Sequence, residues 1–219
     1  MKRDVQAVLF FGGLWGICEA TVGFLVHLLL PGMGWVIYFP LAYGFMRGAY
    51  RQTGKTSAVL ACAILSAAIK LINLPMSPRP DYVINPAVSI VLEGLAVCLA
   101  LRWVREKNRL IMRRGLLPIL ISAAWRGMYL AYLLLAPTWI REASVLYQPE
   151  KLMSFVTLEL LGNGLAISLC SWITGLILKG IKAPLSKHPW AKGRESFKRS
   201  LGALSLLSFG LAVILQWVF

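Results

Sequence analysis

Five ionisable residues lie inside long apolar stretches of this sequence, where a membrane-spanning helix would normally exclude them. They are Glu19, Lys70, Glu93, Arg126 and Glu159. A charge within a bilayer is costly, so such residues face protein or a water-filled cavity and pair with one another or with a ligand. Two interpretations stay open here. The charges form structural ion pairs, for example Lys70 with Glu93 and Arg126 with Glu159, or they bind a polar solute.

The number of charges singles out one of the carboxylates. Three acids and two bases leave one acid without a basic partner, and that acid must be protonated or meet a cationic or hydrogen-bonding group. We assign this role to Glu19 because its helix also carries a stripe of small residues. Helical rise places Glu93 about 12 Å and Glu159 about 10 Å from the outer ends of their helices. Asn163 falls at a similar depth, and it completes the candidate solute site with the five charges.

The first apolar stretch, residues 10–30, is long enough to cross a bilayer, because a span needs about 20 apolar residues. Within it, Gly12, Gly16 and Ala20 recur at four-residue spacing. Small residues at this spacing leave one side of a helix nearly without side chains, so that another helix can approach closely. The stripe is therefore a candidate docking surface for a membrane partner.

Aromatic residues gather near the expected outer ends of the helices, among them Trp35 and Tyr38. They form either an interfacial belt, as is common in membrane proteins, or a surface that stacks on a flat ligand. The sequence has no HExxH, GxSxG or GxxxxGKS/T motif and no metal-ligand spacing, and its four cysteines lie singly in apolar stretches. We therefore expect no catalytic residue, no metal and no cofactor.

The elements that must position these residues are transmembrane helices. Hydrophobic residues make up 58% of the chain, with a mean hydropathy of +0.69, which indicates a polytopic membrane protein. We expect an all-α fold of seven spans in a single transmembrane domain, with a kinked or broken helix at Pro40. The expected spans are residues 10–30, 35–50, 56–74, 85–103, 116–136, 152–178 and 201–219. Residues 1–178 then hold a six-helix core, and residues 201–219 add a further C-terminal span.

The net charge of +14 would suggest a nucleic-acid partner in a soluble protein, but its placement indicates otherwise. Most of the 23 Lys and Arg residues lie before the first expected span or after the second, fourth and sixth. Because basic residues concentrate on the cytoplasmic side, this distribution predicts an inside N-terminus and an outside C-terminus. We expect no nucleic-acid partner and a place in a bacterial or archaeal cytoplasmic membrane.

These features resemble the substrate-binding S components of energy-coupling factor vitamin transporters. The resemblance covers residues 10–178 and rests on the stripe of small residues, a glycine-containing connection at 30–35, FMRG at 45–48 and NPAVSIVLEG at 85–94. The seventh span departs from the six helices typical of that family. The resemblance implies capture of a small water-soluble nutrient, a vitamin or its precursor, from the outer side. It also implies that a separate ATPase module drives transport through a shared transmembrane subunit that docks on the stripe.

The expected function is therefore solute binding and uptake, with the five charges, Asn163, Trp35 and Tyr38 lining or bracing the pocket. The expected partners are a small-molecule solute, the lipid bilayer and a shared transmembrane coupling subunit with its ATPases. Two alternatives stay open. One is an intramembrane enzyme acting on a lipid or isoprenoid, with Glu93 and Glu159 as acid and base and Arg126 holding an anionic head group. The other is a non-catalytic assembly subunit that docks through the stripe.

Overall fold

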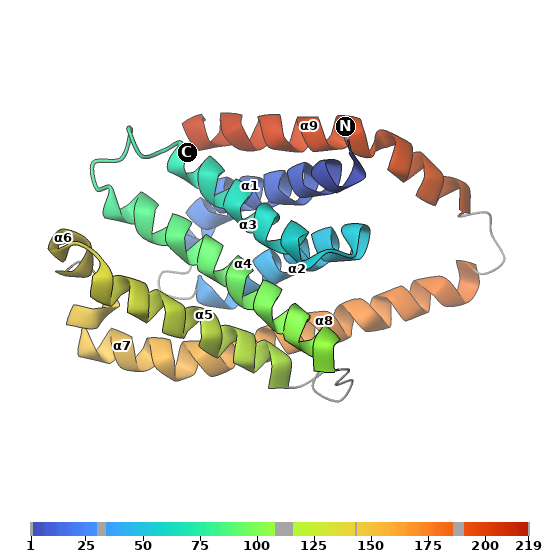
Figure 1. The fold of residues 1–219 in the computed structure, drawn as a ribbon. Coiled ribbons are helices and arrows are strands. Elements are labelled where there is room, and N and C mark those ends of the chain that lie inside the picture. The colour runs from blue at the N-terminus through green and yellow to red at the C-terminus, as the bar shows by residue number, and fades with distance from the viewer. Residues whose placement is uncertain (1, 30–33, 108–115, 143, 186–190, 219) are drawn as a thin grey trace.

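The computed structural model describes residues 2–29, 34–107, 116–142, 144–185 and 191–218, and all secondary structure in these ranges is helical (Figure 1). Only the backbone is described for residues 23–25, 27–28, 35, 106–107, 174–185, 191–199 and 218. The elements are α1 (Arg3–Leu29), α2 (Trp35–Thr53), α3 (Thr56–Leu71), α4 (Asp81–Lys107), α5 (Leu116–Leu135), α6 (Thr138–Glu142), η2 (Val145–Tyr147), α7 (Pro149–Val156), α8 (Leu158–Leu185) and α9 (Ala191–Val218). The predicted all-α fold is confirmed.

Five stretches of the described helices are long and apolar enough to cross a membrane. They are Arg3–Val22, Asp81–Arg105, Leu116–Leu135, Pro149–Ile173 and Ser200–Trp217. α3 is apolar but has only 16 residues, and α2 has 19 residues with two arginines near its end. The long helices expose large apolar side chains, such as Leu135 at 88% and Leu207 at 68%. Such surfaces suit lipid rather than water, so the chain is a multi-pass membrane protein.

The helices form one bundle in which α1 packs against α2, α3 and α9, while α5 packs against α4 and α8. α1 and α9 run in the same direction (Figure 1). Their contacts agree, because Gly13 lies against Phe209 and Gly16 lies against Ala212. The two ends of the described chain therefore lie at opposite ends of the bundle. Seven membrane crossings and an inside N-terminus stay predictions.

Close helix contacts depend on small residues at particular positions. Gly94 of α4 faces Ala63 of α3 so closely that a Cβ on the glycine would overlap the alanine side chain. Gly54 ends α2 with a φ of +71° and donates its N–H to the Tyr50 carbonyl at 2.7 Å. Glycine adopts this left-handed conformation without steric cost. It lets α3 begin two residues later, so that α2 and α3 form a tight hairpin.

Several helices extend beyond the predicted spans, because α1 begins at Arg3, α4 covers Asp81–Lys107 and α9 begins at Ala191. α2 continues through Pro40 as one helix, so the helix is not broken there, and a kink at Pro40 stays a prediction. α3 ends at Leu71, three residues before the predicted end at 74. The chain continues in tight turns, in which the N–H groups of Ile72, Asn73 and Leu74 donate to carbonyls three residues earlier. The sixth span is two helices, α7 and α8, which meet at Thr157.

Candidate functional site

Arg126 of α5 is the least exposed of the described charged residues, at 1%. Its Nε donates a hydrogen bond to the Phe155 carbonyl at 2.9 Å, and its Nη1 donates to the Ser122 hydroxyl at 2.7 Å. The Ser122 hydroxyl in turn donates to the Leu160 carbonyl at 2.9 Å. Nη2 of Arg126 lies 3.7 Å from Oε2 of Glu159. The Arg126–Glu159 ion pair is therefore present, but backbone and hydroxyl groups also hold the guanidinium.

Arg126 compensates for a gap in backbone hydrogen bonding between α7 and α8. Thr157 separates the two helices, with a φ of −116° and a ψ of −79°. Carbonyls in the last turn of a helix lack helical partners, and a bilayer offers no water to replace them. The Phe155 carbonyl lies in this last turn and accepts the hydrogen bond from Arg126. The positive guanidinium also suits the negative end of α7, so Arg126 satisfies a backbone group at the point where the two helices meet.

Aromatic rings surround the guanidinium of Arg126. Its central carbon lies 4.5 Å from the centre of the Trp125 ring and 5.0 Å from the centre of the Phe155 ring. Trp125 packs edge-to-face on Phe39 of α2 and on Phe155 of α7, with ring centres 5.7 Å apart in both pairs. Rings in this position stabilise a desolvated cation. Arg126 and Trp125 thus brace α2, α5 and α7 together.

Glu93 of α4 interacts with charged residues on two other helices, α1 and α5. The residue is 9% exposed, and the Ser89 hydroxyl donates a long hydrogen bond of 3.4 Å to its Oε1. Its carboxylate interacts electrostatically with Glu19 of α1 and with Arg126 of α5. Within the described part of the chain, no basic side-chain nitrogen lies within 4 Å of Glu93. The carboxylate is therefore buried with little direct compensation for its charge.

Glu19 has closer support than the count of charges suggested. The indole Nε1 of Trp15, one turn earlier on α1, donates a hydrogen bond to Glu19 Oε1 at 3.2 Å. Lys70 of α3 acts on Glu19 electrostatically, as Glu19 does on Tyr38 of α2. The Lys70–Glu93 ion pair, an example under the ion-pair interpretation, is not found among the described residues. Neither Glu19 nor Glu93 has a basic side-chain nitrogen within 4 Å there, so Glu19 stays a candidate for the unpaired acid and Glu93 joins it.

The remaining candidate residues lie at different places around the charges. Asn163 is 1% exposed and lies one turn after Glu159 on α8, so the two share one side of that helix. Tyr38 is partly buried on α2 near Glu19. Trp35 begins α2, but its side chain lies outside the described residues. Glu19 thus interacts electrostatically with Lys70, Glu93 and Tyr38, and Glu93 in turn interacts with Arg126.

The stripe of small residues on α1 is covered by the chain's own helices. Gly12 lies against Leu65 of α3, and Gly16 lies against Ile69 of α3 and Ala212 of α9. Ala20, the last residue of the stripe, is buried as well. Docking of a partner subunit on this stripe stays a prediction. In the present arrangement it would require α3 or α9 to move away from α1.

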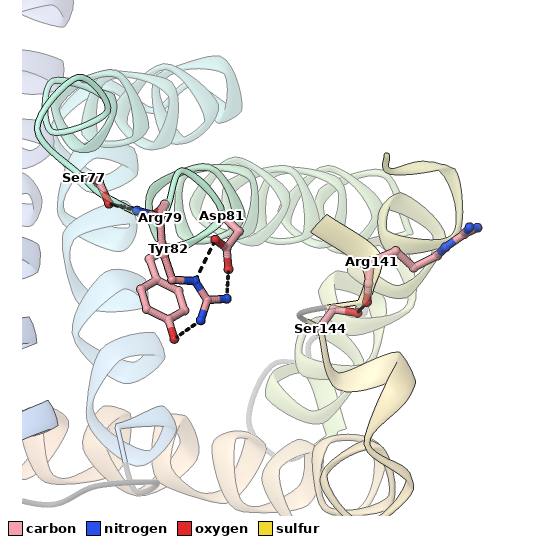
Figure 2. A network of polar contacts seen from close by, with 6 residues as sticks. All are labelled: Ser77, Arg79, Asp81, Tyr82, Arg141 and Ser144. Carbon is pink, nitrogen blue, oxygen red and sulfur yellow. Dashed lines mark hydrogen bonds and ion pairs between the residues drawn. The ribbon is translucent and has the colours of Figure 1, made fainter. Parts of the chain in front are cut away.

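A second polar group lies at the end of the bundle where α3 leads into α4 (Figure 2). Arg79 donates hydrogen bonds to Asp81 Oδ2 at 2.8 Å and to the Tyr82 hydroxyl at 2.9 Å. The hydrogen bond to Asp81 raises the pKa of Arg79 above its ordinary value. Figure 2 shows the Arg141 side chain pointing away from this group. These contacts fix the connection to α4 and involve none of the predicted site residues.

Two grooves open on the surface of the described structure, and none of the five charges lines either of them. One groove of about 500 Å³ lies between α1 and α9 and is almost entirely apolar. The other, of about 570 Å³, lies between α2 and α8 and contains Arg47 and Arg51. Neither groove is therefore the candidate solute site.

Sequence reasoning missed three polar side chains near the charges. Ser122 lies one turn before Arg126, and Trp15 lies one turn before Glu19, so a search at four-residue spacing from each charge finds both. Gln216 of α9 is 1% exposed, and neither of its amide atoms has a hydrogen-bond partner among the described residues. Because α1 and α9 run parallel, Gln216 lies about level with Ala20. Nothing in its sequence context distinguishes it from the rest of an apolar span.

Within the described ranges, no three or more His, Cys, Asp or Glu side chains form a group that could hold a metal ion. No protein-family model, no curated protein and no solved structure matches the chain. The candidate site therefore has to be interpreted from its own geometry.

Proposed function

We propose that this membrane protein binds a small polar solute among α1, α3, α4 and α5 as the first step of its uptake. The observation that carries the proposal is Glu93, a buried carboxylate with no basic nitrogen within 4 Å in the described part of the chain. A carboxylate at membrane depth needs a counter-charge or hydrogen-bond donors. A solute with a cationic or hydrogen-bond-donating group supplies what Glu93 lacks.

The other charges take different roles in this proposal. Arg126 is held by the Phe155 carbonyl and by Ser122, so it braces the site instead of binding the solute directly. Glu19 and Lys70 act on each other electrostatically and form the opposite wall. Tyr38 lies beside Glu19 and offers a ring and a hydroxyl to the same solute.

The break between α7 and α8 supports uptake over simple binding. Discontinuous helices close to buried charges are typical of transporters, where they allow two arrangements around one site. Here the break follows Phe155, and the arginine that stabilises it interacts electrostatically with Glu93. Release of that hydrogen bond would let α7 move without unfolding α8. Solute binding at Glu93 is thus coupled to the position of α7.

A partner of this chain supplies the energy for transport in this proposal. The resemblance to energy-coupling factor S components suggests a vitamin or precursor as the solute and a bacterial or archaeal cytoplasmic membrane as the location. It also suggests a shared transmembrane subunit with ATPases, which fits a chain that has no nucleotide-binding motif. These points rest on the sequence pattern alone.

Thermal unfolding of the purified protein with a panel of water-soluble nutrients tests the binding step. A solute present at 100 times its Kd stabilises the folded state by about 2.7 kcal/mol, which shifts the midpoint by several degrees. We expect such a shift in the wild type and in Glu142→Gln, a matched change at an exposed position of α6. We expect Glu93→Gln to lose it.

Two results would contradict the proposal. A stabilising solute that acts equally on Glu93→Gln would show that the carboxylate is not part of the site. Turnover of a lipid or isoprenoid that depends on both Glu93 and Glu159 would instead support the intramembrane enzyme.

A further inference from the structure

The groove between α2 and α8 has one apolar wall that ends in two cations. Val36, Pro40 and Gly44 follow one another at four-residue spacing along α2, and Arg47 and Arg51 continue the same side of the helix. Ser171 of α8 contributes to the opposite wall. The groove is thus graded along its length, from apolar at the start of α2 to basic near its end.

The two arginines have no acidic partner in the part of the chain that the structure describes. No carboxylate oxygen lies within 4 Å of either guanidinium, although Lys55, a few residues further on, pairs with Asp4 at 2.6 Å. Like charges at this spacing repel each other on a helix. An anion from outside the chain would relieve this repulsion between Arg47 and Arg51.

The length of the groove indicates which anion fits. From Val36 to Arg51 the helix rises about 22 Å, whereas half of the bilayer hydrocarbon is about 15 Å thick. The groove thus reaches from the apolar part of one leaflet into its headgroup region. Gly44 has nothing within 4 Å of the place where a Cβ would stand, so the middle of the groove is open to an acyl chain.

We propose that this groove binds one anionic phospholipid, with the phosphate on Arg47 and Arg51 and one acyl chain along Pro40 and Gly44. Basic pockets between transmembrane helices on the cytoplasmic side recognise anionic lipid head groups in this way. The same end of the bundle holds the N-terminus of α1 and the connection between α2 and α3 (Figure 1). The lipid site is separate from the buried charges, so it does not depend on the proposed solute.

Native mass spectrometry of the full chain, titrated with phosphatidylglycerol or phosphatidylcholine, measures this binding. We expect one phosphatidylglycerol per chain, bound at least tenfold more tightly than phosphatidylcholine. Each basic residue near an anionic lipid contributes about fivefold in affinity, so Arg47→Gln with Arg51→Gln should remove most of this preference. The matched control, Arg3→Gln with Arg105→Gln, removes two exposed charges outside the groove and should retain it.

A second pair of variants tests the acyl-chain part of the groove. Gly44→Leu fills open space, so the protein should fold normally and bind both lipids at least tenfold more weakly. Gly127→Leu is the matched control, because a Cβ at Gly127 would also have nothing within 4 Å of it and this residue lies on α5, away from the groove. It should bind lipid like the wild type.

Three results would overturn the proposal. The first is a wild type that shows no preference for phosphatidylglycerol. The second is an equal loss of affinity in both arginine double variants, which would indicate diffuse attraction by the basic end of the bundle. The third is unchanged lipid binding in Gly44→Leu together with the release of a copurifying protein, in which case the groove docks a protein instead of a lipid.

Discussion

Replacing Arg126 with methionine tests whether the guanidinium supports the helix break or only balances a charge. The substitution removes the donor to the Phe155 carbonyl, the donor to Ser122 and the partner of Glu159. Removing one partner of a buried ion pair costs about 3–5 kcal/mol, and leaving a buried carbonyl unsatisfied costs about 1–3 kcal/mol. Because neighbouring effects do not add fully, we expect the free energy of unfolding to fall by about 4–6 kcal/mol.

Glu159→Gln should cost far less than the loss of Arg126. It removes the negative charge that lies 3.7 Å from Nη2 of Arg126 and that Ser154 also hydrogen-bonds, and it leaves the hydrogen bonds from Arg126 to Phe155 and Ser122 in place. We expect a loss of about 1–2 kcal/mol. The double variant should recover little of the loss in Arg126→Met, because the Phe155 carbonyl stays without its donor.

The double-mutant cycle compares the wild type, Arg126→Met, Glu159→Gln and the double variant. Their unfolding in mixed detergent micelles is followed by circular dichroism. Lys55→Met is a control for an ion pair that is shorter, at 2.6 Å, but exposed, and it should cost at most about 1 kcal/mol. Equal losses in the two single variants with full recovery in the double would refute the reasoning. That result would mean that Arg126 and Glu159 act only as a charge pair.

The remaining predictions concern topology, packing and the second polar group, formed by Arg79, Asp81 and Tyr82. Reporter fusions after Phe219 and within residues 105–114 should lie on opposite sides of the membrane, and the same side for both would reject seven spans. Gly16→Leu forces atoms against Ile69 and Ala212 and should lower the free energy of unfolding by about 1–3 kcal/mol, whereas Gly127→Leu should not. Equal melting midpoints of these two variants would show that α1 does not pack tightly against α3 and α9 at Gly16. Asp81→Asn removes the ion pair to Arg79 and should increase proteolysis between α3 and α4 without changing solute affinity, and a loss of affinity would place this group in the site.

The sequence predicted the helical membrane fold because apolar composition and span length follow directly from bilayer thickness. The same reasoning placed Arg126 and Glu159 at similar depths, and they form an ion pair. It could not decide how Lys70 is oriented, because depth gives the position along a helix but not the side that faces a neighbour. Lys70 acts electrostatically on Glu19, whereas the ion-pair interpretation named Glu93 as an example of its partner.

The helix break at Thr157 could not be predicted from local sequence. No proline or glycine marks it, and residues 152–178 are continuously apolar enough to look like one helix. A contact between distant residues accompanies the break, namely the hydrogen bond from Arg126 to Phe155. At Pro40 the local signal left a kinked or a broken helix open, and α2 continues as one helix.

Mass spectrometry of the small molecules retained by protein purified from its own membrane tests directly whether Glu93 binds a solute. We expect one small polar molecule per chain in the wild type and in Glu142→Gln. In Glu93→Gln we expect at least a tenfold weaker affinity, about 1.4 kcal/mol, with unchanged melting of the solute-free protein. Retention of the same molecule by Glu93→Gln at full affinity would contradict the claim that this carboxylate binds the solute.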